Sequence, residues 1–241
     1  MGILEEYFKG KTFIISGVGK GQGLATLRLF SSMDAYVIAL SRSGSLDAEF
    51  SQKERERIKF FKVDASSEQD VKVFAQKISD YKNKIDGIVS NAGIWEPADE
   101  KLSSPENVVK FFKSNTMSQY NMLYHILPMI REKGSAVVIG ASRNLFRGNQ
   151  SAYTVSKFAL EEVTRSFASE YSHKGMRVNS ILPGGVSKDD NFGKIYPFNF
   201  PEKDGTVEAL QIAYISAFLL SPLSSAINGQ CITADKGMGL E

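Results

Sequence analysis

Short apolar segments alternate with longer stretches of helical spacing along this chain, and no other feature constrains its fold as strongly. Segments rich in Val, Ile and Phe, of the kind expected for strands covered on both faces, lie at residues 12–16, 35–41, 58–63, 85–90, 136–141, 177–182 and 230–234. Helical spacing occurs near residues 22–33, 67–81, 104–131, 152–173 and 206–220, and the charged segment 46–57 is typical of a solvated helix. This alternation predicts the α/β class, with a doubly wound, Rossmann-type parallel sheet of about seven strands between two helical layers.

The composition fits one globular domain. The chain has 241 residues, of which 42% are hydrophobic and 23% charged, and we see no break in composition and no internal repeat. We therefore expect a single domain over residues 1–241 rather than a disordered or fibrous chain. The net charge of +2 is too small to predict a nucleic-acid-binding surface.

Several observations predict a cytoplasmic protein. Cys231 is the single cysteine, so no internal disulfide can form. The amino terminus lacks a basic region followed by an apolar one, and no uncharged stretch approaches the roughly 18 residues of a spanning helix. We expect neither a signal peptide nor a membrane anchor. The sequence shows no grouping of His, Cys and carboxylates that predicts a metal site.

A glycine-rich turn follows the first predicted strand. Gly17, Gly21 and Gly23 lead directly into a helical segment. Glycines allow a tight turn and a close backbone approach, so that a pyrophosphate can bind at the amide groups that begin the helix. Glycine-rich turns are common, but this position between a strand and a helix favours a dinucleotide site.

The end of the second predicted strand bears on the choice of dinucleotide. Ser41 and Arg42 stand there, and no carboxylate follows until Asp47. A carboxylate at this place is typical of NAD sites, whereas arginine suits the 2′-phosphate of NADP. Lys20, within the glycine turn, is a second candidate for the phosphate. We predict NADP(H), with NAD(H) less favoured; the alternative is that both cations are solvated surface charges.

Tyr153 and Lys157 form a candidate acid–base pair. They are four residues apart in a helical segment and therefore share one face. A phenol has an ordinary pKa of about 10, and lowering it by about 3 units requires about 4 kcal/mol, part of which a neighbouring ammonium supplies. Alone, the pair fits an ordinary amphipathic helix; together with the glycine turn it predicts catalysis.

Further motifs follow the predicted strands in order. They are Asp64 after the third strand, Asn91-Ala92-Gly93 after the fourth and Pro183-Gly184 after the sixth. Together with the glycine turn and the Tyr-x-x-x-Lys pair, they resemble the short-chain dehydrogenase/reductase family over nearly the whole chain. The resemblance is to single-domain members such as 3-oxoacyl-acyl-carrier-protein reductases and glucose dehydrogenases.

The resemblance implies a strand order of 3-2-1-4-5-6-7 and an oxidoreductase that acts on CH–OH groups with NAD(P). Tyr153 would give its proton to a carbonyl oxygen in reduction and accept it in oxidation, while Lys157 also holds the nicotinamide ribose. Ser142 would polarise the carbonyl, and Asn115 would hold a water chain that replaces the proton.

Other roles follow from the resemblance in the same way. Asp64 would lie near the adenine and Pro183-Gly184 beside the nicotinamide, and the family's assemblies imply a homotetramer or homodimer. The substrate would be a small carbonyl compound or alcohol. Members of the family act on ketoacyl thioesters, sugars, polyols and steroids, and nothing in this sequence chooses among them.

The chain also departs from the family pattern. Ser142 precedes Tyr153 by 11 residues, about two fewer than usual. Ser187 and Lys188 replace a threonine that contacts the carboxamide in the family, so that role is not transferred. The long segment 184–205 is either a lid or a surface excursion, and Trp95 either lines the active-site mouth or caps the sheet edge.

Two other functions are compatible with parts of the pattern. An NADP(H)-binding sensor with little turnover would keep the glycine turn, and the shortened loop after Ser142 leaves that reading open. A lyase or dehalogenase of this family without a dinucleotide conflicts with the intact glycine turn.

Overall fold

The computed structural model describes residues 2–97, 102–146, 149–188 and 206–238. Its strands are β1 (Thr12–Ser16), β2 (Tyr36–Ser41), β3 (Ile58–Lys62), β4 (Ile85–Ser90), β5 (Ile130–Ile139), β6 (Arg177–Pro183) and β7 (Cys231–Ala234). Its α-helices are α1 (Ile3–Phe8), α2 (Gln22–Ser32), α3 (Gln52–Arg57), α4 (Glu68–Lys77), α5 (Pro105–Phe111), α6 (Ser118–Ile126), α7 (Ser151–Tyr171) and α8 (Ala209–Leu220). Short 3₁₀ turns occupy residues 79–81, 127–129, 172–174 and 222–224.

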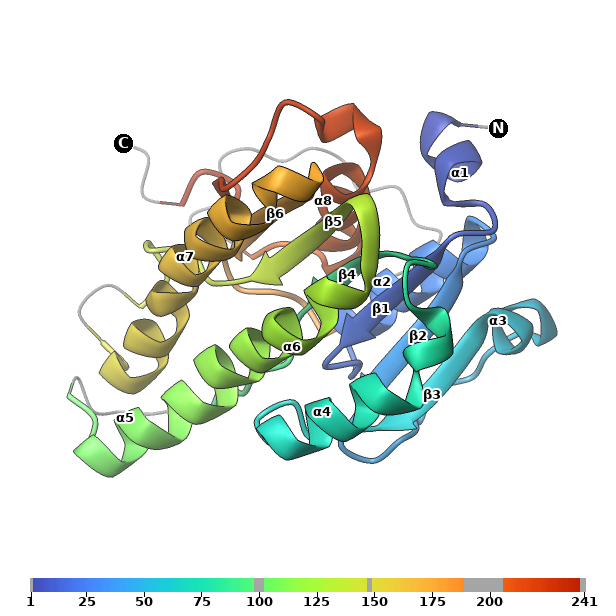
Figure 1. Cartoon of the computed structure of the whole chain (residues 1–241). Helices are drawn as coiled ribbons and strands as arrows, with labels where there is room; N and C mark the ends of the chain where they lie inside the picture. The colour runs from blue at the N-terminus through green and yellow to red at the C-terminus, as the bar shows by residue number, and fades with distance from the viewer. Residues whose placement is uncertain (1, 98–101, 147–148, 189–205, 239–241) are drawn as a thin grey trace.

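The seven strands form one parallel sheet in the order β3-β2-β1-β4-β5-β6-β7 (Figure 1), which confirms the predicted α/β fold and strand order. Ser16, the last residue of β1, lies opposite Leu40 of β2 and Ser90 of β4. The carboxyl ends of these three strands are therefore level. The order of the chain reverses between β1 and β4, and ligands of such sheets bind outside the carboxyl ends of the strands at this switch point.

Alternating side chains on the strands separate the core into two halves. Phe13 and Ile15 of β1 pack with buried residues of α2 and α8, whereas Ile14 faces the opposite half with buried residues of α4 and α6. Figure 1 shows α4, α6 and α7 covering the near face of the sheet and α2 and α8 lying behind it. Because successive side chains point to opposite faces, a strand covered on both sides must be apolar throughout.

The predicted helix near 104–131 is divided in the structure. Between α5 and α6 the segment Phe112–Met117 is a π-helix, and β5 already begins at Ile130 instead of the predicted residue 136. Pro128 lacks the N–H that a continuing helix needs. Ile130 then pairs with Ile85, and the register shifts before the next paired residues of β4 and β5.

Two further differences lie near the amino-terminal half. The charged helix predicted over 46–57 is only α3, which begins after Ser51, whose hydroxyl accepts the Glu54 N–H. The helix α1 was not predicted, and its Phe8 ring stacks on Phe13 with a centroid distance of 4.6 Å. The core contact explains this helix better than its short sequence does.

The segment 184–205, for which the sequence left a lid and a surface excursion as alternatives, lies mostly outside the described residues. Its described part, 184–188, runs along the carboxyl edge of the sheet, where Val186 forms an isolated parallel bridge with Val207. This bridge joins residues 184–188 to Val207, which follows the segment. The fold therefore brings residues 184–188 beside the loops that follow β1, β4 and β5.

Candidate active site

Two cavities lie at the carboxyl edge of the sheet. The glycine-turn cavity has a volume of about 220 Å³. Its lining includes Ser16 at the end of β1, Gly17 in the turn that follows, and Leu40 near the end of β2. The Tyr153 cavity, about 390 Å³, is lined by Tyr153 and by residues from the loops after β4, β5 and β6. Gly93 and Ile94 line both cavities, so the two are adjacent.

The glycine turn and the Asn-Ala-Gly motif contact each other closely. Gly17 has a φ of +71°, and a Cβ placed on it would lie 2.5 Å from the Cα of Ala92. The Asn91 side chain donates a hydrogen bond of 2.8 Å to the Gly17 carbonyl and accepts one from Gln22. Only glycine fits at position 17, because any side chain there would collide with the backbone of the second motif.

The predicted 2′-phosphate residues are not all placed alike. Ser41, Arg42 and Asp64 line the glycine-turn cavity, whereas Lys20 is exposed and does not. The Ser41 hydroxyl donates to the Ser45 carbonyl, and Asp64 accepts bonds from the backbone and hydroxyl of Ser66. Gly21 and Gly23 lie at the start of α2, where Gly21 is the N-cap residue. Arg42 is exposed at the rim.

Tyr153 and Lys157 project from one face of α7 into the Tyr153 cavity. Burial raises the pKa of Tyr153 to about 12 and lowers the pKa of Lys157 to about 8. The Lys157 Nζ donates a 3.0 Å hydrogen bond to the Ile139 carbonyl at the end of β5. The phenol is therefore fully protonated near neutral pH, and in this arrangement burial outweighs any lowering of its pKa by the ammonium.

Asn115 lies in the π-helical segment and is fully buried. Its side-chain oxygen accepts the Ile94 N–H at 2.6 Å, and its amide nitrogen donates to Ser156 of α7 at 2.9 Å. Asn115 thus ties the loop after β4 to the helix that carries Tyr153. Interruptions of this kind in a helix are frequent at functional sites.

Ser142, predicted to polarise the carbonyl, binds Asp235 in the structure. Its hydroxyl donates a 2.6 Å hydrogen bond to Asp235, its side chain is almost fully buried, and it is not among the residues that line the Tyr153 cavity. Asn144 donates to the same carboxylate at 3.1 Å. These bonds attach the loop after β5 to the segment after β7.

The structure adds residues that the sequence did not predict. Pro183 and Gly184 line the Tyr153 cavity, and Gln22 and Lys188 line it as well. A Cβ on Gly21 would lie 3.3 Å from the Cα of Lys188, so this lysine stands beside the start of α2. The position of Lys188 shortly after Pro183-Gly184 was the sequence feature that could have predicted its place in the cavity lining.

Trp95 lines the Tyr153 cavity and is 49% exposed, which supports the first of its two interpretations. Arg143, by contrast, does not face the cavity, because it binds both carboxylate oxygens of Glu161 at 2.8 and 2.9 Å. This bond holds the pKa of the Glu161 carboxyl below its usual value.

Two kinds of site are absent from the described part of the chain. No helix in residues 2–97, 102–146, 149–188 and 206–238 is long and apolar enough to cross a membrane. The same residues contain no group of three or more His, Cys, Asp or Glu side chains able to hold a metal ion.

Comparison with known proteins defines the class of this site. A family model described as Enoyl-(Acyl carrier protein) reductase matches residues 17–239. The chain therefore belongs to this family of short-chain dehydrogenases/reductases, oxidoreductases that act on CH–OH groups with NAD(P).

Individual relatives cover almost the whole chain. The 3-oxoacyl-[acyl-carrier-protein] reductase FabG of Chlamydia muridarum is 30% identical over 242 residues, which are 95% of this chain and 97% of that protein. The uncharacterized oxidoreductase YhdF of Bacillus subtilis is 29% identical over 247 residues, 95% of this chain and 83% of that one. A solved short-chain dehydrogenase family protein from Francisella tularensis is 25% identical, has a TM-score of 0.78, and is matched over 96% of this chain and all of its own (100%).

Proposed function

We propose that this protein is an NADP(H)-dependent carbonyl reductase or alcohol dehydrogenase in which Tyr153 is the general acid–base. The observation that carries the proposal is the adjacency of the two cavities, which places Tyr153 and Lys157 next to the glycine turn across the shared wall of Gly93 and Ile94. A dinucleotide bound along this wall would extend from the glycine-turn cavity to the phenol.

The described residues fit such a cofactor. Gly17 leaves the turn without a side chain where the backbone of the second motif passes, and the glycine-turn cavity offers Asp64 and the hydroxyl of Ser41 at its far end. Lys188 stands beside the N-cap of α2, where a diphosphate binds favourably to helix N–H groups. The family's dinucleotide supplies a hydride to the carbonyl carbon when it is bound.

The proposed chemistry of the chain concerns one proton. In reduction, the protonated Tyr153 hydroxyl donates to the carbonyl oxygen as negative charge develops on it. Lys157, released from the Ile139 carbonyl or still bound to it, places a cation next to the phenolate that results. Ser142 would donate a second hydrogen bond to the same oxygen, which requires its hydroxyl to turn away from Asp235.

We assign the NADP preference to Arg42, with Lys20 as a second partner. Arg42 lines the glycine-turn cavity at the end of β2, where an NAD-selective site usually carries a carboxylate. An arginine can meet a phosphate with two parallel hydrogen bonds, which Lys20 cannot do. Because Lys20 is exposed outside the cavity lining, we expect its contribution to be the smaller one.

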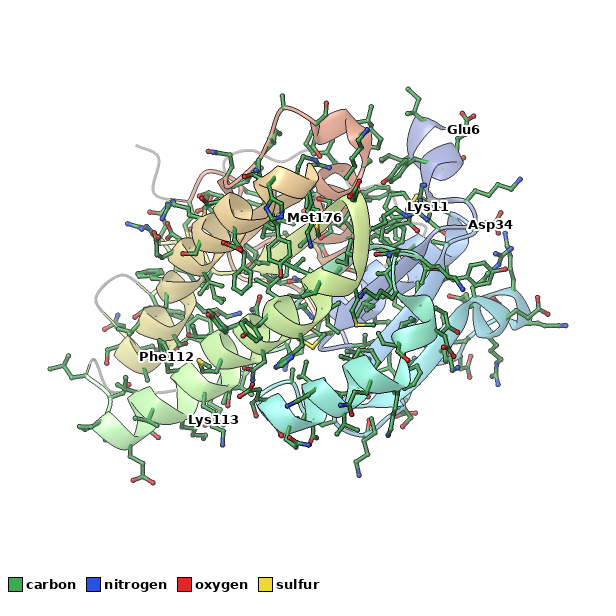
Figure 2. The ribbon with its side chains drawn as sticks, viewed as in Figure 1. Glu6, Lys11, Asp34, Phe112, Lys113 and Met176 are labelled. Carbon is green, nitrogen blue, oxygen red and sulfur yellow. The ribbon has the colours of Figure 1, made fainter. Side chains whose placement is uncertain are left out.

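A homo-oligomer in the cytoplasm is part of the proposal, and the single cysteine is compatible with that location. Exposed apolar side chains follow the helical run from α5 through the π-helix to α6, part of which Figure 2 labels at Phe112 and Lys113. They are Val109, Phe112, Met117, Tyr120 and Tyr124, which are 36–67% exposed. Burying them against a second copy would remove an apolar strip from water. Analytical ultracentrifugation of the purified protein tests this point, and a monomer at all concentrations would contradict it.

The enzymatic proposal is tested by incubating the purified protein with panels of ketones, aldehydes and alcohols in the presence of NADPH, NADH or the oxidised cofactors. Consumption or formation of the reduced nicotinamide is followed by absorbance. We expect carbonyl reduction with NADPH. A protein that binds NADPH tightly but turns over none of these compounds would instead be the sensor.

A further inference from the structure

Two aromatic rings pack against the proton donor. The Phe146 ring lies edge to face with Tyr153 at a centroid distance of 5.8 Å, and the buried Phe111 ring does so at 6.4 Å. Phe146 is in turn nearly parallel to Trp95, with 7° between the ring planes and 6.2 Å between centroids. Trp95 and Phe146 line the Tyr153 cavity, so a carbonyl group that reaches the phenol through this cavity lies against their rings.

A hydrogen bond at the edge of the indole orients Trp95 in addition to its stacking on Phe146. Its indole N–H donates a 3.0 Å hydrogen bond to the side chain of Gln150, the N-cap residue of α7. Held at this edge, Trp95 remains 49% exposed on the wall of the cavity. A rigid, half-exposed aromatic surface binds flat apolar groups at a low cost in conformational entropy.

The polar side chains of the same lining are mostly engaged within the protein. Gln22 and Asn91 bind each other, and Lys157 binds the Ile139 carbonyl. Lys188 stands beside the start of α2, at the cofactor side. Among the lining residues that the structure describes, Tyr153 is therefore the single hydroxyl that faces a substrate.

This lining disfavours polar and acidic substrates. Within the lining that the structure describes, Ile94, Leu145 and Val186 offer no hydrogen-bond partner to the hydroxyls of a sugar or polyol, which weakens binding. Of the two lysines in the described lining, Lys157 donates to the Ile139 carbonyl and Lys188 stands beside the start of α2, so a substrate carboxylate would have to compete with these positions. Shape and charge thus favour an uncharged substrate with a flat apolar body.

We propose that the Tyr153 cavity selects neutral, flat, apolar carbonyl compounds, namely aryl or conjugated ketones and aldehydes, and that the exposed face of Trp95 is their principal binding surface. This inference rests on the carbonyl reductase function proposed above. It adds the substrate class and a specificity-determining residue outside the acid–base pair.

The first test compares uncharged ketones of increasing flat apolar area with polar substrates, using NADPH. We expect kcat/KM to rise about tenfold or more from acetone through cyclohexanone to acetophenone, mainly through KM, because each step buries more apolar surface. Glucose and pyruvate should be much poorer substrates than acetophenone. Equal or better turnover of glucose, pyruvate or acetone would overturn the proposal.

Variants of the ring then locate the effect. Trp95→Leu should raise KM for acetophenone about tenfold with little change for acetone, whereas Trp95→Phe should keep most of the preference. Tyr214→Leu is the matched control, because Tyr214 is a 51% exposed aromatic on α8 that does not line the cavity. An unchanged preference in Trp95→Leu would remove the role given to this residue.

A binding measurement separates failure of this inference from failure of the proposed function. Trp95 is the single tryptophan of the chain, so its fluorescence reports on the cavity without any turnover. Acetophenone should change the emission saturably, with or without NADP⁺, in the wild type and in Tyr153→Phe alike; N-acetyltryptophanamide corrects for collisional quenching. Saturable binding without turnover would count against the reductase alone. A signal no different from that of N-acetyltryptophanamide would overturn the aromatic site.

Discussion

The two adjacent cavities are built by different means. The glycine-turn cavity is formed at level strand ends, where backbone groups and absent side chains decide the shape. The Tyr153 cavity is formed by helix α7 and by loops after β4, β5 and β6, where the orientation of each side chain decides. The first is a consequence of sheet topology, whereas the second depends on local hydrogen bonds such as that from Ser142 to Asp235. The same fold can therefore keep its cofactor end while its substrate end changes.

The largest expected effect separates the two cavities. Tyr153→Phe removes the proton donor and leaves the glycine-turn cavity untouched, so kcat should fall by about 10⁴-fold while NADPH affinity stays within a factor of about three. Steady-state kinetics and a fluorescence titration of NADPH measure both quantities. Near-normal turnover in a folded variant would eliminate the proposed mechanism.

The reverse separation uses Arg42 at the end of β2 and Lys20 in the glycine turn. The double variant Lys20→Ala, Arg42→Ala should weaken NADPH binding by about 10²–10⁴-fold, since two charge-assisted hydrogen bonds are lost, and should leave NADH binding nearly unchanged. Titrating both cofactors against the wild type, the double variant and each single variant measures this effect. A wild type that binds NADH as well as NADPH would show that these residues are surface charges.

Lys188 sharpens the same experiment as a control. It lies beside the start of α2, away from the end of β2, so Lys188→Ala should weaken NADPH and NADH by the same factor. If this variant lost affinity for NADPH alone, the 2′-phosphate would bind beside Lys188 and not at the end of β2, which would contradict the assignment to Arg42.

A smaller effect tests Ser142, whose hydroxyl donates to Asp235 in the structure. If Ser142 reaches the carbonyl oxygen during the reaction, Ser142→Ala should lower kcat by about 10²-fold. A change of less than about threefold, together with a lower unfolding temperature, would mean that the hydroxyl serves Asp235 alone. Kinetics and thermal unfolding of the one variant decide between these outcomes.

The smallest effect concerns pH. Burial lowers the pKa of Lys157 to about 8, so its ammonium is present below that pH and is lost as the pH rises through it. For reduction, kcat/KM should therefore fall about fivefold between pH 8 and 9, because Tyr153 stays protonated throughout. Lys157→Arg keeps its charge in this range, and any activity it retains should lack this decline. A flat profile in the wild type would show that the charge of Lys157 is not needed.

The sequence predicted most of the fold, for a physical reason that also marks its limits. Strands such as β1 and β4 were placed correctly because burial on both faces demands continuous apolar residues. The start of β5 was missed because Ile130 joins β4 across a register shift, which no periodicity encodes. The helix α1 was missed because it depends on the contact of Phe8 with Phe13 in the folded core. Phe13 lies outside the six-residue helix, so the helical segment itself does not encode this contact.

The candidate site, like the fold, has features that the sequence could predict and features that it could not. The glycine turn and the Asn-Ala-Gly motif could be found because their backbone geometry requires particular residues, whereas the partners of Ser142 and Arg143 could not. Asp235 lies 93 residues from Ser142 in the sequence. Glu161 engages Arg143 across the start of α7. The Ser142–Asp235 and Arg143–Glu161 pairs both depend on side-chain rotamers in the folded protein, and the spacing of these residues in the sequence carries little information about the rotamers.

The 2.5 Å approach of position 17 to Ala92 has a consequence for the history of such proteins. A side chain gained at Gly17 would displace the Asn-Ala-Gly motif, so we expect the two motifs to be inherited together. Lineages that abandon the dinucleotide should therefore lose both motifs over a short interval, while lineages that change substrate can vary the loops around Tyr153 freely. Comparing related sequences for joint loss would test whether selection has treated the two as one.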